Sequence, residues 1–403
     1  MNKLNYWIII LYLILSGCNE DYKVTPGSYV GNLYTVDNQE IPFNLDVLKD
    51  GSVQIFNHKE IVNMENILYT KDSFLIKSPV FEGYIKAKKT SFGLEGYFIN
   101  NSLDRKIEFK ANPGHQRFKL KNDSKNYNFS GKWKVVFNPE KLEEYNAIGI
   151  FDQKNSKISG TFRTTTGDYG FMEGVSEGDL IKLSTFNGAH SYLFKGEAEE
   201  NIISGYFYRG NYNKIPFIAN RDKNYELPDP NNLTLLNNQY NNFEFSFEDS
   251  AGEVVSYNDS KFKDKVLVVQ IMGTWCPNCL DETTFLSEFI SKNNHKDLEF
   301  VSLAFEYVKT KDRAIKNINK LKARFNIKYP ILLAQFGTSN KVEAQKRIPS
   351  LEQVVSYPTL IFIDKKKNVR RIHTGFNGPA TGEKYENFKR EFKELILKLI
   401  AEN

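Results

Sequence analysis

The amino-acid sequence predicts an all-β N-terminal region, a sandwich or barrel that is duplicated, followed by a C-terminal α/β domain. Three observations lead to this fold class. Short runs of alternating apolar and polar residues fill residues 27–221, where no long stretch keeps a helical period. From residue 242 onward, continuous apolar runs alternate with segments of helical periodicity. Within this second part, two cysteines three residues apart directly follow one of the apolar runs.

The bulk properties indicate a globular protein of more than one domain. The chain has 403 residues, of which 40% are hydrophobic and 26% are charged. Its formal net charge is +5, with Lys and Arg spread among Asp and Glu rather than gathered. Because there is no basic arm or stripe that could follow a phosphate backbone, we expect no nucleic-acid partner.

Residues 1–17 have the pattern of a signal peptide. Lys3 supplies a positive start, and the apolar run 6–15 is too short to span a bilayer comfortably. The run ends in Leu15-Ser16-Gly17-Cys18, which resembles the lipobox of bacterial lipoproteins. This resemblance implies cleavage before Cys18, lipid on its thiol, and anchorage to a cell-envelope membrane, facing the periplasm or the cell surface. The alternative is an uncleaved hydrophobic anchor with an incidental cysteine.

The β region contains an internal echo. Gly96-Tyr97-Phe98 and Gly205-Tyr206-Phe207 are each followed, after a short gap, by a strand with similar apolar spacing. We therefore expect two related β units, at residues 27–113 and 128–221, although two aromatic-rich strands can also agree by coincidence. The region shows no cluster of catalytic residue types, and its role is not predicted. Residues 222–241 are rich in Pro, Asp and Asn and are expected to form a linker.

The predicted elements of the C-terminal domain, residues 242–403, begin with parallel strands. They are, in order, a strand at 243–247, a buried strand at Val266–Met272, a helix at 277–290, a buried strand at Leu298–Phe305, a helix at Lys311–Phe325, strands at 360–363 and Val369–Thr374, and a helix at 385–400. The two cysteines lie where the first buried strand gives way to the first helix.

The placement of the cysteines predicts thiol chemistry. A helix that begins at Pro277 makes Cys276 its N-cap, since Pro is favoured at the first helical position. The amides of the first turn then point at the Cys276 sulfur and favour its thiolate. Cys279 lies three residues on, on the same face, and is close enough to form a disulfide. We expect Cys276 to be an exposed attacking thiol and Cys279 a sheltered resolving thiol.

These residues resemble the TlpA/ResA-like branch of the thioredoxin superfamily. The matching features are Gly273-Thr274-Trp275-Cys276-Pro277-Asn278-Cys279, Glu282, and Tyr357-Pro358-Thr359 before a strand. The resemblance implies a thioredoxin-like fold, a cis Tyr357–Pro358 bond, and substrate binding at Trp275, Pro277, Tyr357 and Pro358. It also implies a thiol–disulfide oxidoreductase that uses a Cys276–Cys279 disulfide and no bound cofactor. Disulfides of exported proteins would be its substrates, and a membrane thiol transporter its electron donor.

One departure from the thioredoxin pattern changes the expected proton chemistry. Thioredoxins carry a buried Asp in the strand before the motif, and this sequence has Gln270, which cannot accept a proton. We therefore expect Glu282 to accept the proton of Cys279. Glu306, just past a buried strand, is a second candidate acid or docking group, with a solvated loop position as the alternative.

Other functions remain open at this stage. A peroxidase of the peroxiredoxin type needs a Thr three residues before its Cys, whereas Thr274 is two before Cys276. A zinc site would need four ligands, which the chain does not supply near the dithiol. A two-coordinate copper(I) site is conceivable because soft thiolates select that ion. A binding lipoprotein without enzymatic activity is the remaining alternative.

Overall fold

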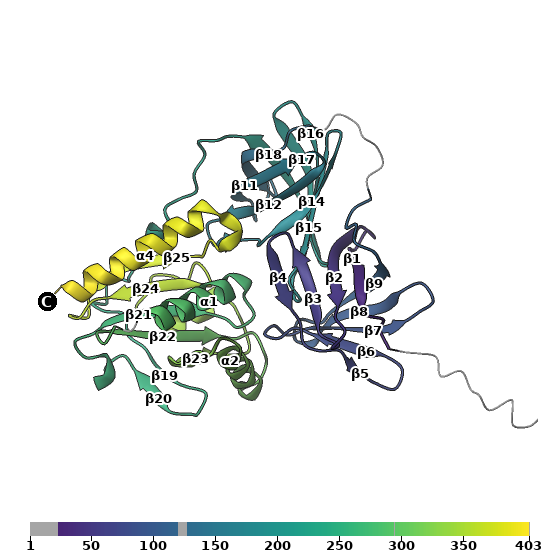
Figure 1. Cartoon of the computed structure of the whole chain (residues 1–403). Coiled ribbons are helices and arrows are strands. Elements are labelled where there is room, and N and C mark those ends of the chain that lie inside the picture. Colours follow the sequence, from purple (N-terminus) through teal and green to yellow (C-terminus); the bar gives the residue numbers. More distant parts are fainter. Residues whose placement is uncertain (1–22, 120–126, 294, 403) are drawn as a thin grey trace, which may run out of the picture.

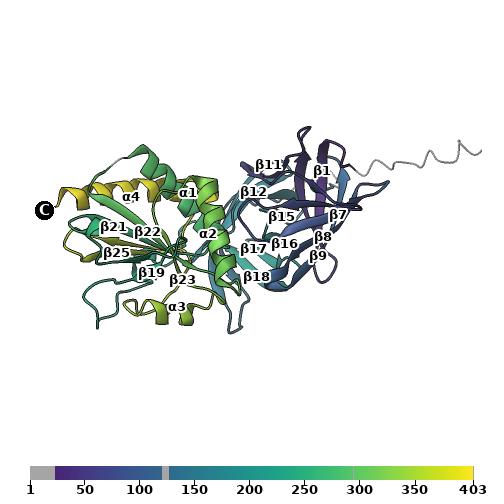
Figure 2. The same cartoon turned by 90° about the horizontal axis from the view of Figure 1, so that it is seen from below.

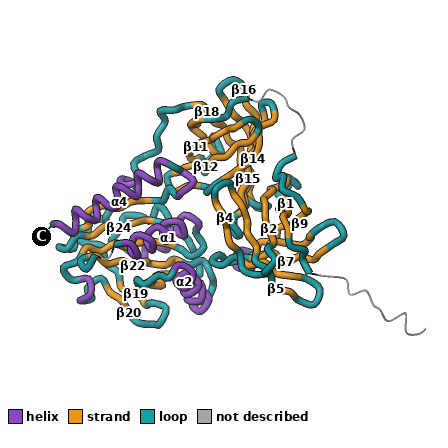
Figure 3. Tube along the Cα trace, in the orientation of Figure 1, coloured by secondary structure: helices purple, strands orange, loops and turns teal. Residues whose placement is uncertain are grey.

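The computed structural model describes residues 23–119, 127–293 and 295–402. It confirms the predicted fold class, with an all-β N-terminal part and a C-terminal α/β part (Figure 1). The long helices gather around the C-terminal sheet, while strands make up the rest of the molecule (Figure 3). Cys18, the expected lipid site, lies outside the described residues. Within the described ranges, no helix is long and apolar enough to cross a membrane.

The first β unit is an open antiparallel sheet that curves into a half-barrel. Its strand order is β4-β3-β2-β1-β9-β8-β7-β6-β5, so β4 and β5 form its two edges. The strands are β1 Gly27–Tyr34, β2 Glu40–Val47, β3 Val53–Asn57, β4 Glu60–Asn63, β5 Leu68–Tyr69, β6 Phe74–Lys77, β7 Tyr84–Lys89, β8 Leu94–Asn100 and β9 Arg105–Pro113.

The second β unit closes into an eight-stranded barrel, because β11 pairs with β12 as well as with β10. The two-residue strand β13 extends from β12 outside this ring. The strands are β10 Gly131–Phe137, β11 Tyr145–Lys154, β12 Lys157–Thr164, β13 Gly167–Asp168, β14 Met172–Glu177, β15 Leu180–Phe186, β16 Ser191–Glu199, β17 Ile202–Arg209 and β18 Asn213–Arg221.

The internal echo corresponds to equivalent places in the two units. In each unit the first strand pairs with the last, β1 with β9 and β10 with β18. Gly96 lies opposite Phe109 in the first unit, and Gly205 lies opposite Phe217 in the second. A Cβ added to Gly96 would lie 2.0 Å from a backbone oxygen of the adjacent strand, and one added to Gly205 would lie 2.1 Å away. Close strand packing thus requires glycine at both places, and the duplication of the two units stays a prediction.

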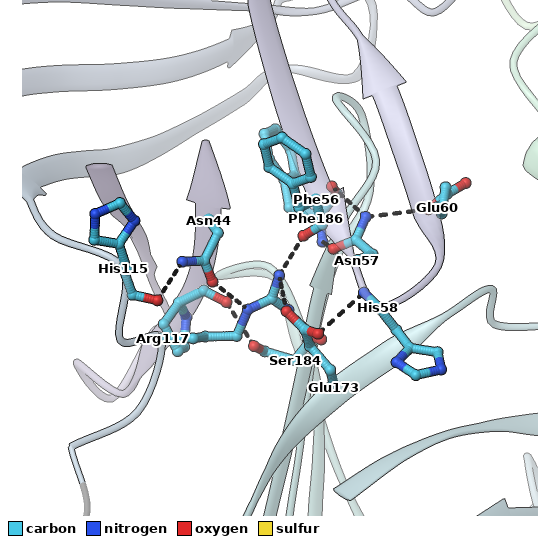
Figure 4. A network of polar contacts seen from close by, with 11 residues as sticks. Asn44, Phe56, Asn57, His58, Glu60, His115, Arg117, Glu173, Ser184 and Phe186 are labelled. Atoms are coloured by element: carbon cyan, nitrogen blue, oxygen red, sulfur yellow. Dashed lines mark hydrogen bonds and ion pairs between the residues drawn. The ribbon is translucent and has the colours of Figure 1, made fainter. Parts of the chain in front are cut away.

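The half-barrel packs its open side on the barrel. Phe186 of β15 enters the core of the half-barrel, where its ring centroid lies 4.7 Å from that of Phe43. The buried amide of Asn57 donates to the Phe186 carbonyl at 3.0 Å and accepts from the Phe186 amide at 3.2 Å. Arg117 adds an ion pair of 3.0 Å with Glu173 of the barrel (Figure 4). The apolar contact and the satisfied polar groups together fix the two units to each other.

The C-terminal sheet has the order β23-β22-β21-β24-β25, with β21, β22 and β23 parallel and the other two antiparallel to them. Helices α1 and α4 cover one face and α3 the other (Figure 2). The elements are β19 Ser246–Glu248, β20 Val254–Ser256, β21 Val266–Met272, α1 Pro277–Lys292, β22 Leu298–Phe305, α2 Lys311–Phe325, β23 Ile331–Gln335, α3 Lys341–Arg347, β24 Thr359–Ile363, β25 Val369–Thr374 and α4 Glu383–Ala401. The sequence did not predict β20, β23 and α3, and the strand expected at 243–247 is found at Ser246–Glu248.

The segment between the barrel and the C-terminal domain is anchored at both ends. Asp222 donates its amide to the Lys132 carbonyl of the barrel at 3.1 Å. Farther on, Asn237 donates its amide to the Ser350 carbonyl at 2.8 Å, and Thr234 is buried beside Thr374. The expected linker, residues 222–241, is therefore held against the barrel near its start and against the C-terminal domain near its end.

Candidate active site

The central strand β21 and the helix α1 place the two cysteines. All seven residues of β21 are buried, which fixes the strand in the middle of the sheet. Cys276 then has extended backbone (φ −96, ψ 120) and caps α1, and Pro277 occupies the first helical turn. The Cys279 amide donates to the Cys276 sulfur at 3.2 Å. This donor stabilises negative charge on that sulfur, and it is the helix-start arrangement that the sequence predicted.

Both thiols are free and buried. The exposed fraction is 6% for Cys276 and 0% for Cys279. The Cys276 thiol donates to the Tyr357 carbonyl at 3.4 Å, and the Tyr357–Pro358 bond is cis, as the resemblance implies. Burial is the largest cause that raises the pKa of Cys279 well above its ordinary value, with the neighbouring Cys276 adding to it. The prediction of an exposed Cys276 is therefore wrong for the whole chain.

Aromatic side chains pack together next to the dithiol. The Trp275 indole donates to the Phe305 carbonyl at 2.9 Å, which folds the ring back over the end of β22. Its ring packs edge-on against the rings of Tyr357 and Tyr307, with ring centroids 5.7 Å and 5.8 Å apart, respectively. Such edge contacts are favourable for aromatic pairs and hold Trp275 in place beside Cys276. Pro277 is half-buried at the start of α1.

Glu282 is the buried acid that the sequence singled out. It lies in α1 with no exposed surface, and its Oε2 atom accepts from the Gln270 amide at 2.8 Å. Its Oε1 atom has no hydrogen-bond partner among the described residues, which leaves a place for a proton. Burial raises the pKa of Glu282 to about 8, although the Gln270 bond opposes this shift. Gln270 is itself held by Ser302 at 2.7 Å, so it orients the carboxyl without titrating.

Glu306 is a second buried carboxyl close to the motif. It is fully buried, which rules out the solvated loop position. Its carboxylate accepts from the Thr274 amide at 2.8 Å and from the Thr274 hydroxyl at 2.7 Å. Burial raises the pKa of Glu306 to about 7. Through its two hydrogen bonds with Thr274, Glu306 thus fixes the loop that carries Trp275 and Cys276.

Part of the barrel also lies at the site. The barrel hairpin, residues 163–168 at the end of β12 and in β13, contacts the two loops that flank the dithiol. The Thr166 carbonyl accepts from the Ser356 hydroxyl at 3.1 Å, one residue before Tyr357. The Asp168 carboxylate accepts from the Gly378 amide at 2.6 Å.

Sequence reasoning missed this hairpin. It is threonine-rich, its Arg163 and Asp168 form no recognisable catalytic motif, and its partners are some 200 residues away along the chain. The one feature of the sequence that could have indicated the contact is Gly167, a glycine at the end of a hairpin. Its close approach to the redox loops is visible only in the fold.

Comparison with known families and proteins supports the C-terminal resemblance. The Redoxin family model matches residues 237–388. The thiol-disulfide oxidoreductase ResA of Bacillus cereus is 26% identical over 148 residues, which is 36% of this chain and 73% of the relative. The thioredoxin-like protein YneN of Bacillus subtilis is 28% identical over 132 residues, or 33% of this chain and 68% of the relative.

Solved structures overlap the same part of the chain. A thiol:disulfide interchange protein from Chlorobium tepidum has a TM-score of 0.30 at 19% identity, covering 40% of this chain and 95% of the other. A thiol-disulfide oxidoreductase from Bacteroides fragilis has a TM-score of 0.27 at 16% identity, covering 37% and 99%.

Proposed function

We propose that this chain, whose C-terminal part is a thioredoxin-like domain of the thiol–disulfide oxidoreductase family, reduces disulfides of exported proteins outside the cytoplasm. The observation that carries the proposal is the pair of free thiols at the start of α1, with the Cys279 amide 3.2 Å from the Cys276 sulfur. The buried carboxyl of Glu282 on the same helix also supports the proposal.

The reaction runs through a mixed disulfide. The Cys276 thiolate attacks one sulfur of the substrate disulfide, forms a bond to it, and releases the other substrate sulfur as a thiolate. Cys279 gives its proton to Glu282 and attacks the Cys276 sulfur, which releases the second substrate thiol. The substrate gains two electrons, and the chain is left with a Cys276–Cys279 disulfide. An external dithiol, in the cell a membrane thiol donor, returns the pair to the reduced state.

The proposal is tested by a reductase assay on the whole chain. With dithiothreitol as donor, the wild-type chain should accelerate reduction of insulin disulfides, and Cys276→Ser should reduce the rate to the uncatalysed background. Serine keeps the size of the side chain, and its hydroxyl cannot form the mixed disulfide. The whole proposal fails if Cys276→Ser is as active as the wild type, or if neither protein exceeds dithiothreitol alone.

The proposed location depends on Cys18. A lipid on its thiol would tether the domains to a membrane of the cell envelope. We expect the protein from its native host to have Cys18 as its N-terminal residue, with lipid added to the mass of residues 18–403. Intact-mass spectrometry of the membrane fraction checks this. A mature chain that begins at Met1, or one without lipid, contradicts the anchored location and leaves the redox proposal unaffected.

A further inference from the structure

We propose that the barrel hairpin, residues 163–168, determines which substrates reach Cys276. With the barrel against the C-terminal domain, the dithiol exchanges with small disulfides, and a protein disulfide reaches it only when the hairpin moves away. This inference rests on the proposed function, because it concerns access to the same dithiol. It assigns a role in specificity to a β unit that carries no catalytic group of its own.

Hydrogen bonds hold the hairpin against the C-terminal domain, with donors on both sides of the contact. Ser356 donates to the Thr166 carbonyl at 3.1 Å, and Gly378 donates to the Asp168 carboxylate at 2.6 Å. Arg163 adds a bond of 3.3 Å from its Nε atom to the Asn377 side chain. These partners lie on the two loops that flank the dithiol, before Tyr357 and after β25. A substrate polypeptide that paired with the Tyr357 loop would have to displace the hairpin.

Two glycines allow the close approach. A Cβ on Gly167 would lie 2.0 Å from the side-chain nitrogen of Asn278 and 2.9 Å from the backbone carbonyl oxygen of Phe376. A Cβ on Gly375 would lie 2.8 Å from the backbone of Thr166. Asn278 stands between the two cysteines, so the hairpin touches the redox motif itself. Cys276 of the same motif is only 6% exposed although it caps the helix.

The hairpin meets the redox loops through polar contacts, as expected of a contact that opens. Within the described ranges, these contacts are the hydrogen bonds of Thr166, Asp168 and Arg163. The half-barrel adds an ion pair of 2.9 Å between Glu82 and Arg313 of α2, in which Arg313 is exposed and Glu82 is largely buried. Val80 of the half-barrel also packs in the apolar core of the C-terminal domain. Domain interfaces that are not large and hydrophobic commonly permit relative motion of the domains.

The test compares a large and a small thiol probe. In a Cys18→Ser/Cys279→Ser background, Cys276 is the only remaining cysteine of the chain. Gly167→Val introduces a side chain where the hairpin meets Asn278. Gly170→Val is the matched control, because Gly170 also has positive φ (+70) but has nothing within 4 Å of an added Cβ. Labelling rates are measured with iodoacetamide and with a maleimide that carries a long polymer.

The expected result is a change in size selection. If the open arrangement is a minor state of about 10% or less, forcing it open should raise the rate with the polymer-bearing probe by about tenfold or more. The rate with iodoacetamide should change much less, and Gly170→Val should behave like the parent chain. Equal polymer-probe rates in the parent and in a folded Gly167→Val chain overturn the proposal.

A second variant covers the case in which Gly167→Val does not fold. Arg163→Ala/Asp168→Ala removes two of the bonds and leaves the glycines in place, and the same probe comparison decides the outcome. Circular dichroism reports whether each variant is folded. Failure of the proposed function is seen separately, because then the wild-type chain, which keeps both Cys276 and Cys279, does not accelerate insulin reduction, whatever the labelling rates of the variants.

Discussion

Replacing Cys279 by Ser is expected to stop multiple turnover and to leave substrate attached to Cys276. The first exchange step needs only the Cys276 sulfur, which keeps the backbone N–H of residue 279 as a donor at 3.2 Å. The second step needs a thiol at residue 279, and a hydroxyl cannot attack the mixed disulfide at a useful rate. Steady-state insulin reduction should therefore fall to background while one equivalent of substrate is bound.

The bound substrate is measured on diagonal non-reducing gels and by mass spectrometry of the purified chain. Cys276→Ser/Cys279→Ser is the matched control, because it should retain no substrate at all. Unchanged turnover in Cys279→Ser would show that resolution does not need the second cysteine. In that case the two-thiol mechanism is wrong, even if Cys276 is the attacking residue.

Replacing Glu282 by Gln is expected to slow the resolving step by about 10²-fold, the low end of general acid–base effects. Glutamine keeps the shape and the contact with Gln270 but cannot accept the proton of Cys279. Burial raises the pKa of Glu282 to about 8, so the carboxylate that accepts the proton becomes more abundant as the pH rises through 8. The wild-type resolution rate should rise over that range, and the Gln variant should lack this rise.

Stopped-flow release of a thiol leaving group from a preformed Cys276 mixed disulfide, followed from pH 5 to 9 (roughly the range around the raised pKa), gives this profile. Glu288→Gln is the matched control, since Glu288 lies on the same helix and is exposed. An independent readout is stability. Because folding raises the pKa of Glu282, its contribution to the free energy of unfolding is complete at acid pH and is lost as the pH rises through about 8. An unchanged rate profile in Glu282→Gln contradicts the assigned role.

The sequence was informative where chemistry and local structure coincide. The apolar run Val266–Met272 followed by Cys276 and Pro277 specifies a buried strand, a cap and a helix start within a few residues, and the structure has all three. The importance of Gln270 was also visible, although its role was not. It does not replace a titrating Asp, and instead it orients Glu282 through a bond of 2.8 Å.

For two of the elements that the sequence did not predict, the reason is local. The strand β23, Ile331–Gln335, is a five-residue apolar run, too short to tell a strand from part of a helix. The helix α3, Lys341–Arg347, is one of seven residues with a single buried member, Ala344. So few buried residues give no periodic pattern, and the capping bonds of Asn340 that define its start depend on geometry.

The burial of Cys276 could not be predicted from any local pattern. The Cys276 sulfur lies against the Tyr357 carbonyl, and the barrel hairpin joins the same loop, where the Ser356 hydroxyl donates to the Thr166 carbonyl across 190 residues of chain. A Thr-Thr-Thr-Gly turn is typical of any exposed hairpin. Only the closed barrel and its docking on the C-terminal domain give that turn its position, so the sequence indicated an exposed thiol where the fold provides a covered one.

The central claim is that Cys276 attacks and Cys279 resolves. The most direct measurement is alkylation of the reduced whole chain with iodoacetamide at mildly acidic pH, followed by peptide mapping of the adduct. Cys276 has the amide of Cys279 directed at its sulfur, whereas burial raises the pKa of Cys279 well above its ordinary value. The first equivalent of label is expected on Cys276. Preferential labelling of Cys279 would contradict it.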